Sequence, residues 1–226
     1  MGCCRLCTLV VLLGAAVPAF SQDSAPVEDK RVFGVLPNYR TTEASLPFEP
    51  ISAPHKMNIA FRDSFDWPVY PTAALFAALY QLEDQNPSFG QGLKGYAKRF
   101  AGAYGDQMIG NMLTEGVVPS LLHEDPRYFR LGEGSTSHRM AYAATRIFVT
   151  RTDRGHNTLN IAELGGNATA VALSNAWYPD TRTASDNAQK YLIQLATDSF
   201  SNVLKEFWPD IKHRLFQKNR ARSAPQ

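Results

Sequence analysis

The sequence predicts an all-α protein, with a single helical bundle-like domain of about five or six helices over residues 55–210 and a proline-rich N-terminal arm before it. Three observations lead to this prediction. Apolar and small residues recur at helical spacing from residue 68 onward. Capping patterns and prolines separate these stretches from one another. The arm, residues 22–54, carries five prolines and little periodicity, which favours irregular structure.

The first 21 residues have the pattern of a secretory signal peptide. Arg5 supplies the positive region, Leu6–Val17 the apolar region, and Ala19–Ser21 a small-x-small cleavage site. We therefore expect an exported protein of the periplasm or cell envelope that begins at Gln22. N-terminal acylation is disfavoured because position 6 is leucine rather than serine or threonine. An uncleaved anchor is disfavoured because the apolar stretch is shorter than the roughly 20 residues of a membrane span.

Removing the signal peptide changes the composition in a way that excludes several functions. The chain has 226 residues, a net charge of +2 and three cysteines, all within the first seven residues. The remaining 205 residues carry a net charge of +1 and no cysteine. Structural disulfides, cysteine-ligated zinc and a thiol nucleophile are therefore excluded for the mature chain. The near-zero charge also argues against a nucleic-acid partner.

The first half of the domain is expected to hold two long helices and two short ones. Ser52 precedes a short element to Phe61, for which a helix is slightly favoured over a strand. Longer helices are predicted at about 71–84 and 93–113, because small and large side chains repeat there at helical spacing. Prolines 119 and 126 bracket a short helical turn.

The second half is expected to hold three helices and a free tail. Helices are predicted at about residues 138–150, 161–177 and 184–207. Ser135 or Ser137 caps the first of these, Asn160 with Glu163 opens the second, and Thr183 with Asp186 opens the third. Trp208-Pro209 is expected to end the last helix. Residues 211–226 are predicted to be a basic, disordered tail.

Stripes of small residues raise the question of a membrane. Ala162, Gly166, Ala170 and Ser174 lie on one face of the helix predicted at 161–177, as in closely packed membrane helices. The longest charge-free stretches, 67–82 and 164–179, are nevertheless short of a membrane span. Tight packing in a helical core is the favoured interpretation, and peripheral membrane association stays open.

A glycine motif at Gly90–Gly95 matches the G-x-G-x-x-G pattern of dinucleotide-binding proteins, and Glu115 follows twenty residues after Gly95. That motif works only between a strand and a helix, where the turn brings the helix N-terminus to the pyrophosphate. The preceding segment is predicted to be helical. We therefore expect no nicotinamide cofactor, and no other cofactor, and assign these glycines to a closely packed loop.

The densest polar cluster is His123–Arg130, which reads His-Glu-Asp-Pro-Arg-Tyr-Phe-Arg. Its spacing matches no zinc motif, so no metal site is predicted. The cluster overlaps a region, 127–154, whose basic residues are all arginine, a side chain suited to phosphate and carboxylate groups. The alternatives are an anion site, for example for lipid headgroups, and a solvated face with internal ion pairs. The candidate binding residues are His123, Asp125, Arg127, Arg130, Arg139 and Arg146.

Signals for hydrolytic chemistry are weak. No G-x-S-x-G elbow is present, and the adjacent Ser137 and His138 do not make a triad. Glu115, Glu124 and Asp125 are carboxylates of the kind that cleave glycans, but their spacing selects none of them.

Four segments carry a resemblance: Ser88–Gly92, Leu121–Arg130, Arg146–Asp153 and Val203–Asp210. Together they resemble an uncharacterised family of exported bacterial helical proteins, of the acidobacterial type. The resemblance implies an envelope location and no activity. The sequence therefore favours a non-enzymatic binding or structural component of the bacterial envelope, with a lipid, glycan or protein partner. The alternative is an enzyme that acts on an envelope lipid or glycan through His123–Arg130.

Overall fold

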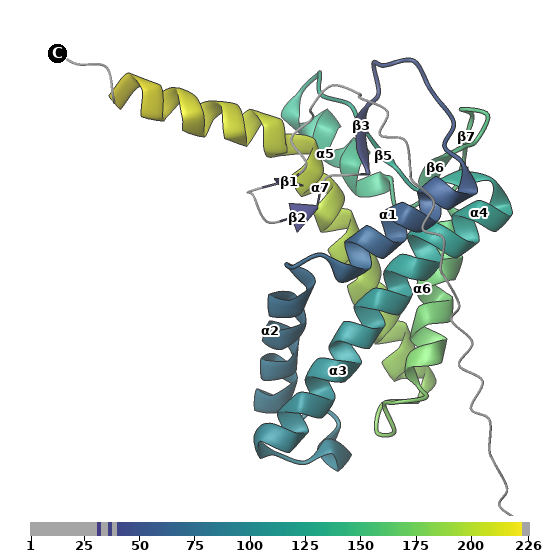
Figure 1. Ribbon diagram of the computed structural model, residues 1–226, viewed down its shortest axis with the longest axis vertical. Coiled ribbons are helices and arrows are strands. Elements are labelled where there is room, and N and C mark those ends of the chain that lie inside the picture. The colour runs from purple at the N-terminus through teal and green to yellow at the C-terminus, as the bar shows by residue number, and fades with distance from the viewer. Residues whose placement is uncertain (1–30, 33–35, 38–39, 223–226) are drawn as a thin grey trace, which may run out of the picture.

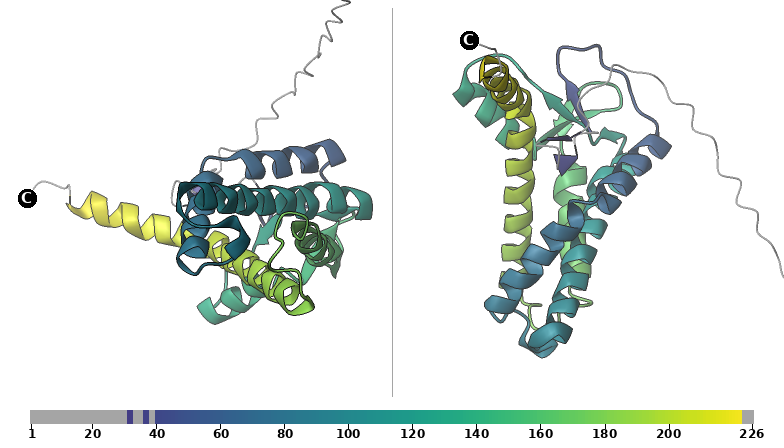
Figure 2. Two further views of the ribbon diagram at one scale, coloured as in Figure 1. Left: turned by 90° about the horizontal axis from the view of Figure 1, so that it is seen from below. Right: turned by 60° about the vertical axis from the view of Figure 1, so that its left-hand side comes forward.

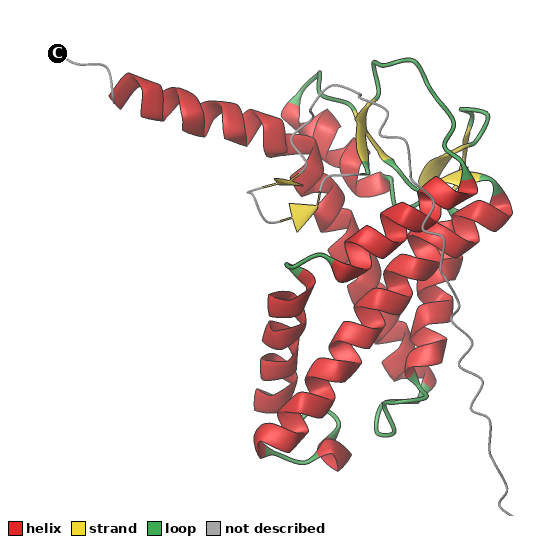
Figure 3. Cartoon of the chain, viewed as in Figure 1, coloured by secondary structure: helices red, strands yellow, loops and turns green. Residues whose placement is uncertain are grey.

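The computed structural model describes residues 31–32, 36–37 and 40–222, so the expected signal peptide, residues 1–21, lies outside the described part. Helices make up 66% of the structure, which confirms a mostly helical protein. The all-α prediction is corrected in one respect, because three small sheets accompany the helices, two of them at one end of the molecule (Figure 3).

The end of the arm is fixed by strand pairing. Strands β1 (Arg31–Val32) and β2 (Leu36–Pro37) pair with each other in antiparallel fashion. Strand β3 (Thr41–Glu43) then pairs in parallel with β5 (Tyr128–Arg130). This pairing attaches the end of the arm to the segment that the sequence analysis singled out.

The first two helices follow the sequence signals closely. Helix α1 (Ala53–Phe65) begins directly after Ser52, with Pro54 in its first turn, where a missing N–H costs nothing. The helical alternative for this segment is therefore confirmed. Helix α2 (Val69–Leu82) has no charged residue and lies against the next long helix, α3 (Gly92–Asn111) (Figure 1).

The glycine motif forms a turn around a buried arginine. It follows η1 (Pro87–Phe89), a short 3-10 helix rather than a strand. The guanidinium of Arg99 is fully buried and donates to the Gly90 carbonyl oxygen at 2.6 Å. A Cβ at Gly95 would lie 2.0 Å from that same oxygen. Glycine is therefore required at Gly95 for close packing, which is the role that the sequence analysis assigned to this loop.

Helix α3 continues directly into a π-helix, η2 (Met112–Val117), and then into α4 (Val118–Leu122). No pattern in the sequence predicted this π-helix. It lies between α1 and α6, and small residues permit both approaches. A Cβ at Gly116 would meet Met57 of α1 at 2.9 Å, and one at Gly166 would meet Thr114 at 2.9 Å. Wider turns of this kind are common at functional sites.

The segment from 123 to 160 differs most from the prediction. Strands β4 (Glu124–Asp125), β6 (Val149–Thr152) and β7 (Asn157–Leu159) form an antiparallel sheet. Helix α5 (Thr136–Thr145) is capped by Ser135, whose hydroxyl accepts from the His138 N–H. The helix predicted to reach residue 150 ends five residues earlier, because the β-branched residues of β6 pair with two neighbouring strands.

The last two helices begin where their caps predict. In α6 (Ile161–Ser174) the Asn160 side chain accepts from the Glu163 N–H at 3.0 Å. Helix α6 ends three residues before the predicted Trp177. In α7 (Ala184–Arg222) the Thr183 and Asp186 side chains each accept from the other's backbone N–H.

The prediction that Trp208-Pro209 ends the last helix is wrong. Helix α7 continues through Pro209 to Arg222, so helix replaces most of the expected disordered tail. Figure 1 shows that α7 bends and that its C-terminal part projects away from the other helices, as proline within a helix commonly causes. The Glu206 carbonyl oxygen accepts from Arg130 and Arg139, both at 2.9 Å. Side chains thus satisfy a backbone acceptor in the turn that the proline disturbs.

The helices and sheets define two ends of the molecule. The charged end holds β3–β7, α4, α5 and the middle of α7, and it lies at the top of Figure 1. The cavity end holds α2, most of α3, the C-terminal half of α6 and the first half of α7. Helix α6 packs against α3 and against α7, and Figure 2 shows α1 and α3 side by side. None of the described helices is long and apolar enough to cross a membrane.

Candidate functional site

The six residues predicted as a binding site are divided among three places. His123 ends α4 in a left-handed conformation (φ 57°), and its side chain is 82% exposed beside Asp153. Asp125, two residues later, is 1% exposed in β4. The Arg127 guanidinium donates to both carboxylate oxygens of Asp125, with Nε–Oδ1 at 3.0 Å and Nη2–Oδ2 at 2.6 Å. The turn that these two residues frame explains why neighbours in sequence do not converge on one point.

Arg130 and Arg139 meet at Glu206: both donate to its backbone carbonyl oxygen, and Arg139 also pairs with its carboxylate. This side chain is fully buried, and it accepts from Arg139 Nε at 2.8 Å and from the Tyr128 hydroxyl at 2.7 Å. The backbone N–H groups of residues 131 and 132 donate to it as well. These hydrogen bonds, Arg139 first, outweigh burial and lower the pKa of Glu206. The cluster is a saturated ion-pair network that joins β5 and α5 to α7.

Arg146, the sixth residue, lies with Asp125 and Arg127 in the wall of a cavity of about 30 Å³. The structure therefore brings three of the six predicted residues together, takes two to Glu206 and leaves His123 at the surface. The small cavity has room for water or an ion and not for an organic substrate.

A larger cavity, of about 240 Å³, lies at the cavity end between α2, α3, α6 and α7. Its walls are mostly uncharged. Phe76, Tyr80 and Tyr178 contribute aromatic rings, and Ala170 and Ser174 belong to the small-residue stripe of α6. Six side-chain amides line it: Gln85, Asn86, Gln107, Asn167, Gln189 and Gln194. Its charged residues are Asp106, Asp186 and Lys190. Mixed walls with a few placed polar groups are typical of small-molecule sites.

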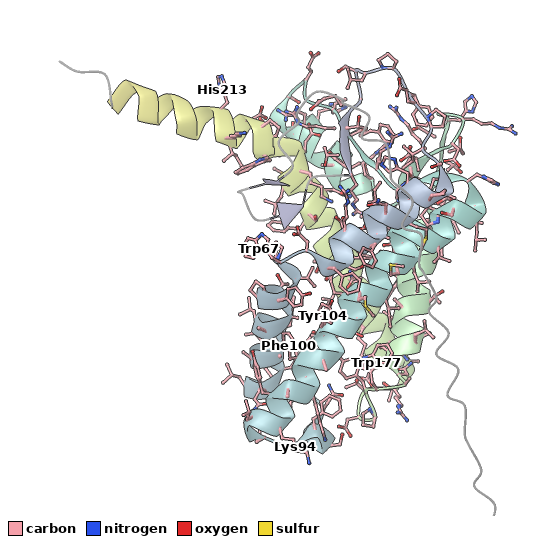
Figure 4. The ribbon with its side chains drawn as sticks, in the orientation of Figure 1. Trp67, Lys94, Phe100, Tyr104, Trp177 and His213 are labelled. Atoms are coloured by element: carbon pink, nitrogen blue, oxygen red, sulfur yellow. The ribbon has the colours of Figure 1, made fainter. Side chains whose placement is uncertain are left out.

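Asp106 is the best-placed acidic group in this cavity. It lies on α3 and accepts from the Tyr178 hydroxyl at 2.8 Å and from the Trp177 indole N–H at 3.2 Å. Figure 4 shows Trp177 beside α3 near the lower end of the helices. Burial raises the pKa of Asp106 to about 6, although both donors and Lys190 favour its charged form. Asp106 therefore gains or loses a proton near pH 6.

Glycine at position 102 makes the contact between Tyr178 and Asp106 possible. A Cβ there would lie 2.6 Å from the Tyr178 hydroxyl oxygen. Burial, followed by the charge of Asp106, raises the pKa of Tyr178, so its hydroxyl keeps its proton and remains a donor. The residues around Asp106 are thus held in fixed positions, as a specific binding site requires.

A pair of acids lies beside the upper wall of the larger cavity. Glu163 of α6 and Asp198 of α7 are hydrogen-bonded, and burial, followed by the charge of Asp198, raises the pKa of Glu163 to about 8. The Asn167 amide donates to both carboxyl groups, at 3.2 and 3.1 Å, and also lines the cavity. Two carboxyl groups in contact share a proton because both cannot be ionised at low cost. Asn167 thus links this pair to the cavity.

A second pair of acids lies deeper in the protein. Asp63 of α1 and Glu115 of η2 are hydrogen-bonded, and burial raises the pKa of Glu115 well above its ordinary value against the opposing charge of Arg40. Arg40 pairs with Glu115, and burial, followed by the charge of Arg40, lowers the pKa of Lys205 to about 8. Within the part of the chain that the structure describes, no group of three or more histidine, cysteine or acidic residues is placed to hold a metal.

Asp106, Glu163 and Asp198 were not predicted as site residues, although the sequence carries a signal for them. Each is the only charged residue in a long uncharged stretch, namely 100–114, 160–179 and 191–204. An acid that is alone on an otherwise uncharged helix faces inward more often than an acid on a helix with many charges. Glu163 was noticed only as a capping residue.

Comparisons with known proteins add no assignment to this geometry. The chain matches no protein-family model, no curated protein and no solved structure.

Proposed function

We propose that this protein is an exported, non-enzymatic binding component of the bacterial envelope, built as one helical domain over residues 55–210. Its binding site is the cavity between α2, α3, α6 and α7. The observation that carries the proposal is the composition of that cavity, in which side-chain amides, hydroxyls and aromatic rings predominate over charged groups. The family resemblance and the signal-peptide pattern support the envelope location.

The chemistry of the walls favours an uncharged ligand rich in hydroxyl or amide groups, such as a fragment of an envelope glycan. Amides both donate and accept hydrogen bonds, which suits hydroxyl groups. The aromatic rings of Phe76, Tyr80 and Tyr178 suit the apolar face of a sugar ring. A volume of about 240 Å³ lies below the roughly 300–1,000 Å³ of sites for drug-sized ligands. We therefore expect a ligand of monosaccharide size.

A binding experiment with a filled cavity tests this proposal. Ala103 lines the cavity on α3, whereas Ala101 is exposed on the same helix. Titration calorimetry with glucose, N-acetylglucosamine, choline and octanoate is measured for the native protein, A103W and A101W. We expect a neutral sugar to bind the native protein and A101W, with at least a tenfold loss in A103W. Binding of choline or octanoate alone, or equal binding by both variants, contradicts the proposal.

The enzymatic alternative has less support. In the His123–Arg130 segment Asp125 pairs with Arg127, Arg130 pairs with Glu43 and Asp210, and His123 is exposed. The cavity that Asp125, Arg127 and Tyr128 line has a volume of only about 30 Å³.

Peripheral membrane association has one observation in its favour. The tip of the α2–α3 hairpin exposes Leu82 (83%) and Leu93 (84%), and Gln81 joins the two helices by donating to the Gly92 carbonyl oxygen. Exposed apolar side chains at one tip suit the interface of a bilayer. We expect co-sedimentation with lipid vesicles that L82S/L93S abolishes and that detergent reverses but salt does not. Recovery of the native protein in the supernatant contradicts this association.

A further inference from the structure

The small cavity at the charged end has an unusual wall. Its volume is about 30 Å³, whereas a single water needs at least about 10–15 Å³ measured in this way. It lies where the arm meets the body of the protein. Three arginines line it: Arg40 from the arm, Arg127 between β4 and β5, and Arg146 at the end of α5.

Two of these arginines have a carboxylate partner and the third has none. Arg40 pairs with Glu115, and Arg127 forms a two-point pair with Asp125. Within the described residues, the structure gives Arg146 no carboxylate partner. Its guanidinium lies over the Tyr142 ring, 4.3 Å from the centroid. A cation–π contact of this kind uses the face of the guanidinium, so it does not satisfy the N–H donors in the plane of the group.

The small cavity is also lined by two arginines with buried N–H donors that lack an acceptor. The Nε atoms of Arg40 and of Arg146 are both buried, and neither has a hydrogen-bond partner. Both residues line the small cavity. Buried N–H groups of charged side chains are costly to leave without an acceptor. Two such donors at one cavity therefore indicate that an acceptor occupies it.

The charges around the cavity favour an anion as that acceptor. The acids in its wall are Asp125, which Arg127 neutralises, and Glu163. Burial holds the pKa of Glu163 at about 8, so this acid is mostly neutral at pH 7. Glu115, which forms an ion pair with Arg40, shares a proton with Asp63. The wall thus holds more positive than negative charge, and the excess is that of Arg146.

We propose that this cavity binds one small monovalent anion, of the size of chloride, between Arg40 and Arg146. The anion accepts from both Nε–H groups and neutralises the charge of Arg146. Because Arg40 belongs to the arm and Arg146 to the body, the anion also attaches the arm to the body. This site is separate from the larger cavity and does not depend on the proposed function.

Thermal unfolding at constant ionic strength tests the site. The protein, produced from the full sequence, is titrated by replacing sodium gluconate with sodium chloride or bromide. Gluconate is too large for a cavity of about 30 Å³. We expect Tm to rise with the logarithm of the halide concentration above the Kd, by about 3–6 °C at ten times the Kd. A rise that is absent, or that grows in proportion to the halide concentration rather than with its logarithm, overturns the proposal.

Two arginine variants locate the effect. In R146M the dependence of Tm on chloride is expected to vanish, whereas R154M, the same change at an exposed position, keeps it. An unchanged response in R146M overturns the assignment. Should R146M fail to fold, anomalous diffraction from a bromide-soaked crystal of the native protein decides. A peak between Arg40 and Arg146 supports the site, and water alone there overturns it.

Discussion

The charged end and the cavity end use polar side chains in opposite ways. At the charged end, buried charges neutralise one another, as in the Glu206–Arg139 pair and in the pair between Lys56 and Asp153. At the cavity end, α2 has no charge at all, and amides and hydroxyls surround an open space. Closed ion-pair networks fix the backbone and leave few groups free for a ligand. Uncharged groups around a cavity remain available for one.

The two ends meet where α6 crosses η2. On one side of this crossing the Asp63–Glu115 pair contacts Arg40, and on the other the Glu163–Asp198 pair contacts Asn167 in the cavity wall. Stacked rings continue the packing into the cavity end, where Tyr104 lies against Tyr70 and Phe100 (Figure 4). Substitutions at Glu206, at Gly166 and at the Glu163–Asp198 pair test how the charged end and the boundary contribute to stability.

The largest effect is expected from removing the centre of the charged end. E206A leaves Arg139 and the Tyr128 hydroxyl without their shared acceptor, and breaking a buried pair costs about 3–5 kcal/mol. Urea unfolding followed by circular dichroism measures this loss. The matched control is E133A, an exposed glutamate, for which we expect less than about 0.5 kcal/mol. Equal losses in both variants would mean that the Glu206 network contributes no stability.

An intermediate effect is expected at the boundary, where two adjacent glycines have opposite surroundings. A Cβ at Gly166 would meet the Thr114 backbone at 3.2 Å, whereas at Gly165 its nearest contact is 3.8 Å away. G166A should therefore lose about 1–3 kcal/mol through overpacking. G165A should gain about 0.5–1 kcal/mol, because alanine favours the helix. Thermal unfolding distinguishes the two, and a stabilised G166A would refute the close α6–η2 contact.

The third effect concerns pH and the Glu163–Asp198 pair. Glu163 keeps its proton in the folded protein up to about pH 8, but is ionised in the unfolded chain above its ordinary pKa of 4.5. The folded state therefore holds more protons in this window, and stability falls as pH rises from about 5 to 8. One proton corresponds to a slope of at most about 1.4 kcal/mol per pH unit.

The substitution E163Q removes this contribution, since glutamine does not ionise. We expect a flatter dependence of the urea midpoint on pH between 5 and 8 in E163Q, and an unchanged dependence in E133Q. Parallel curves for the native protein and E163Q would show that the acid pair is already ionised at neutral pH.

Local signals predicted the helices well and the site poorly. Caps at Ser135, Asn160 and Thr183 mark helix starts, because a cap needs only residues within one turn. The end of α5 was misplaced, because β6 forms only through pairing with distant strands. Pro209 was taken as a helix end, because the two arginines that donate to the Glu206 carbonyl oxygen in its turn lie 76 and 67 positions from Glu206 in the sequence.

By itself, the sequence determined a mostly helical protein, the helix starts and the dense polar segment at residues 123–130. Only the tertiary structure decided which polar groups are available. It places Asp125, Arg127 and Arg146 around one small cavity, and Asp106 in a larger one. Helix propensity and capping act over a few residues, so sequence patterns report them directly. Burial, charge pairing and cavities depend on residues far apart in the chain, and these interactions determine where a ligand has room.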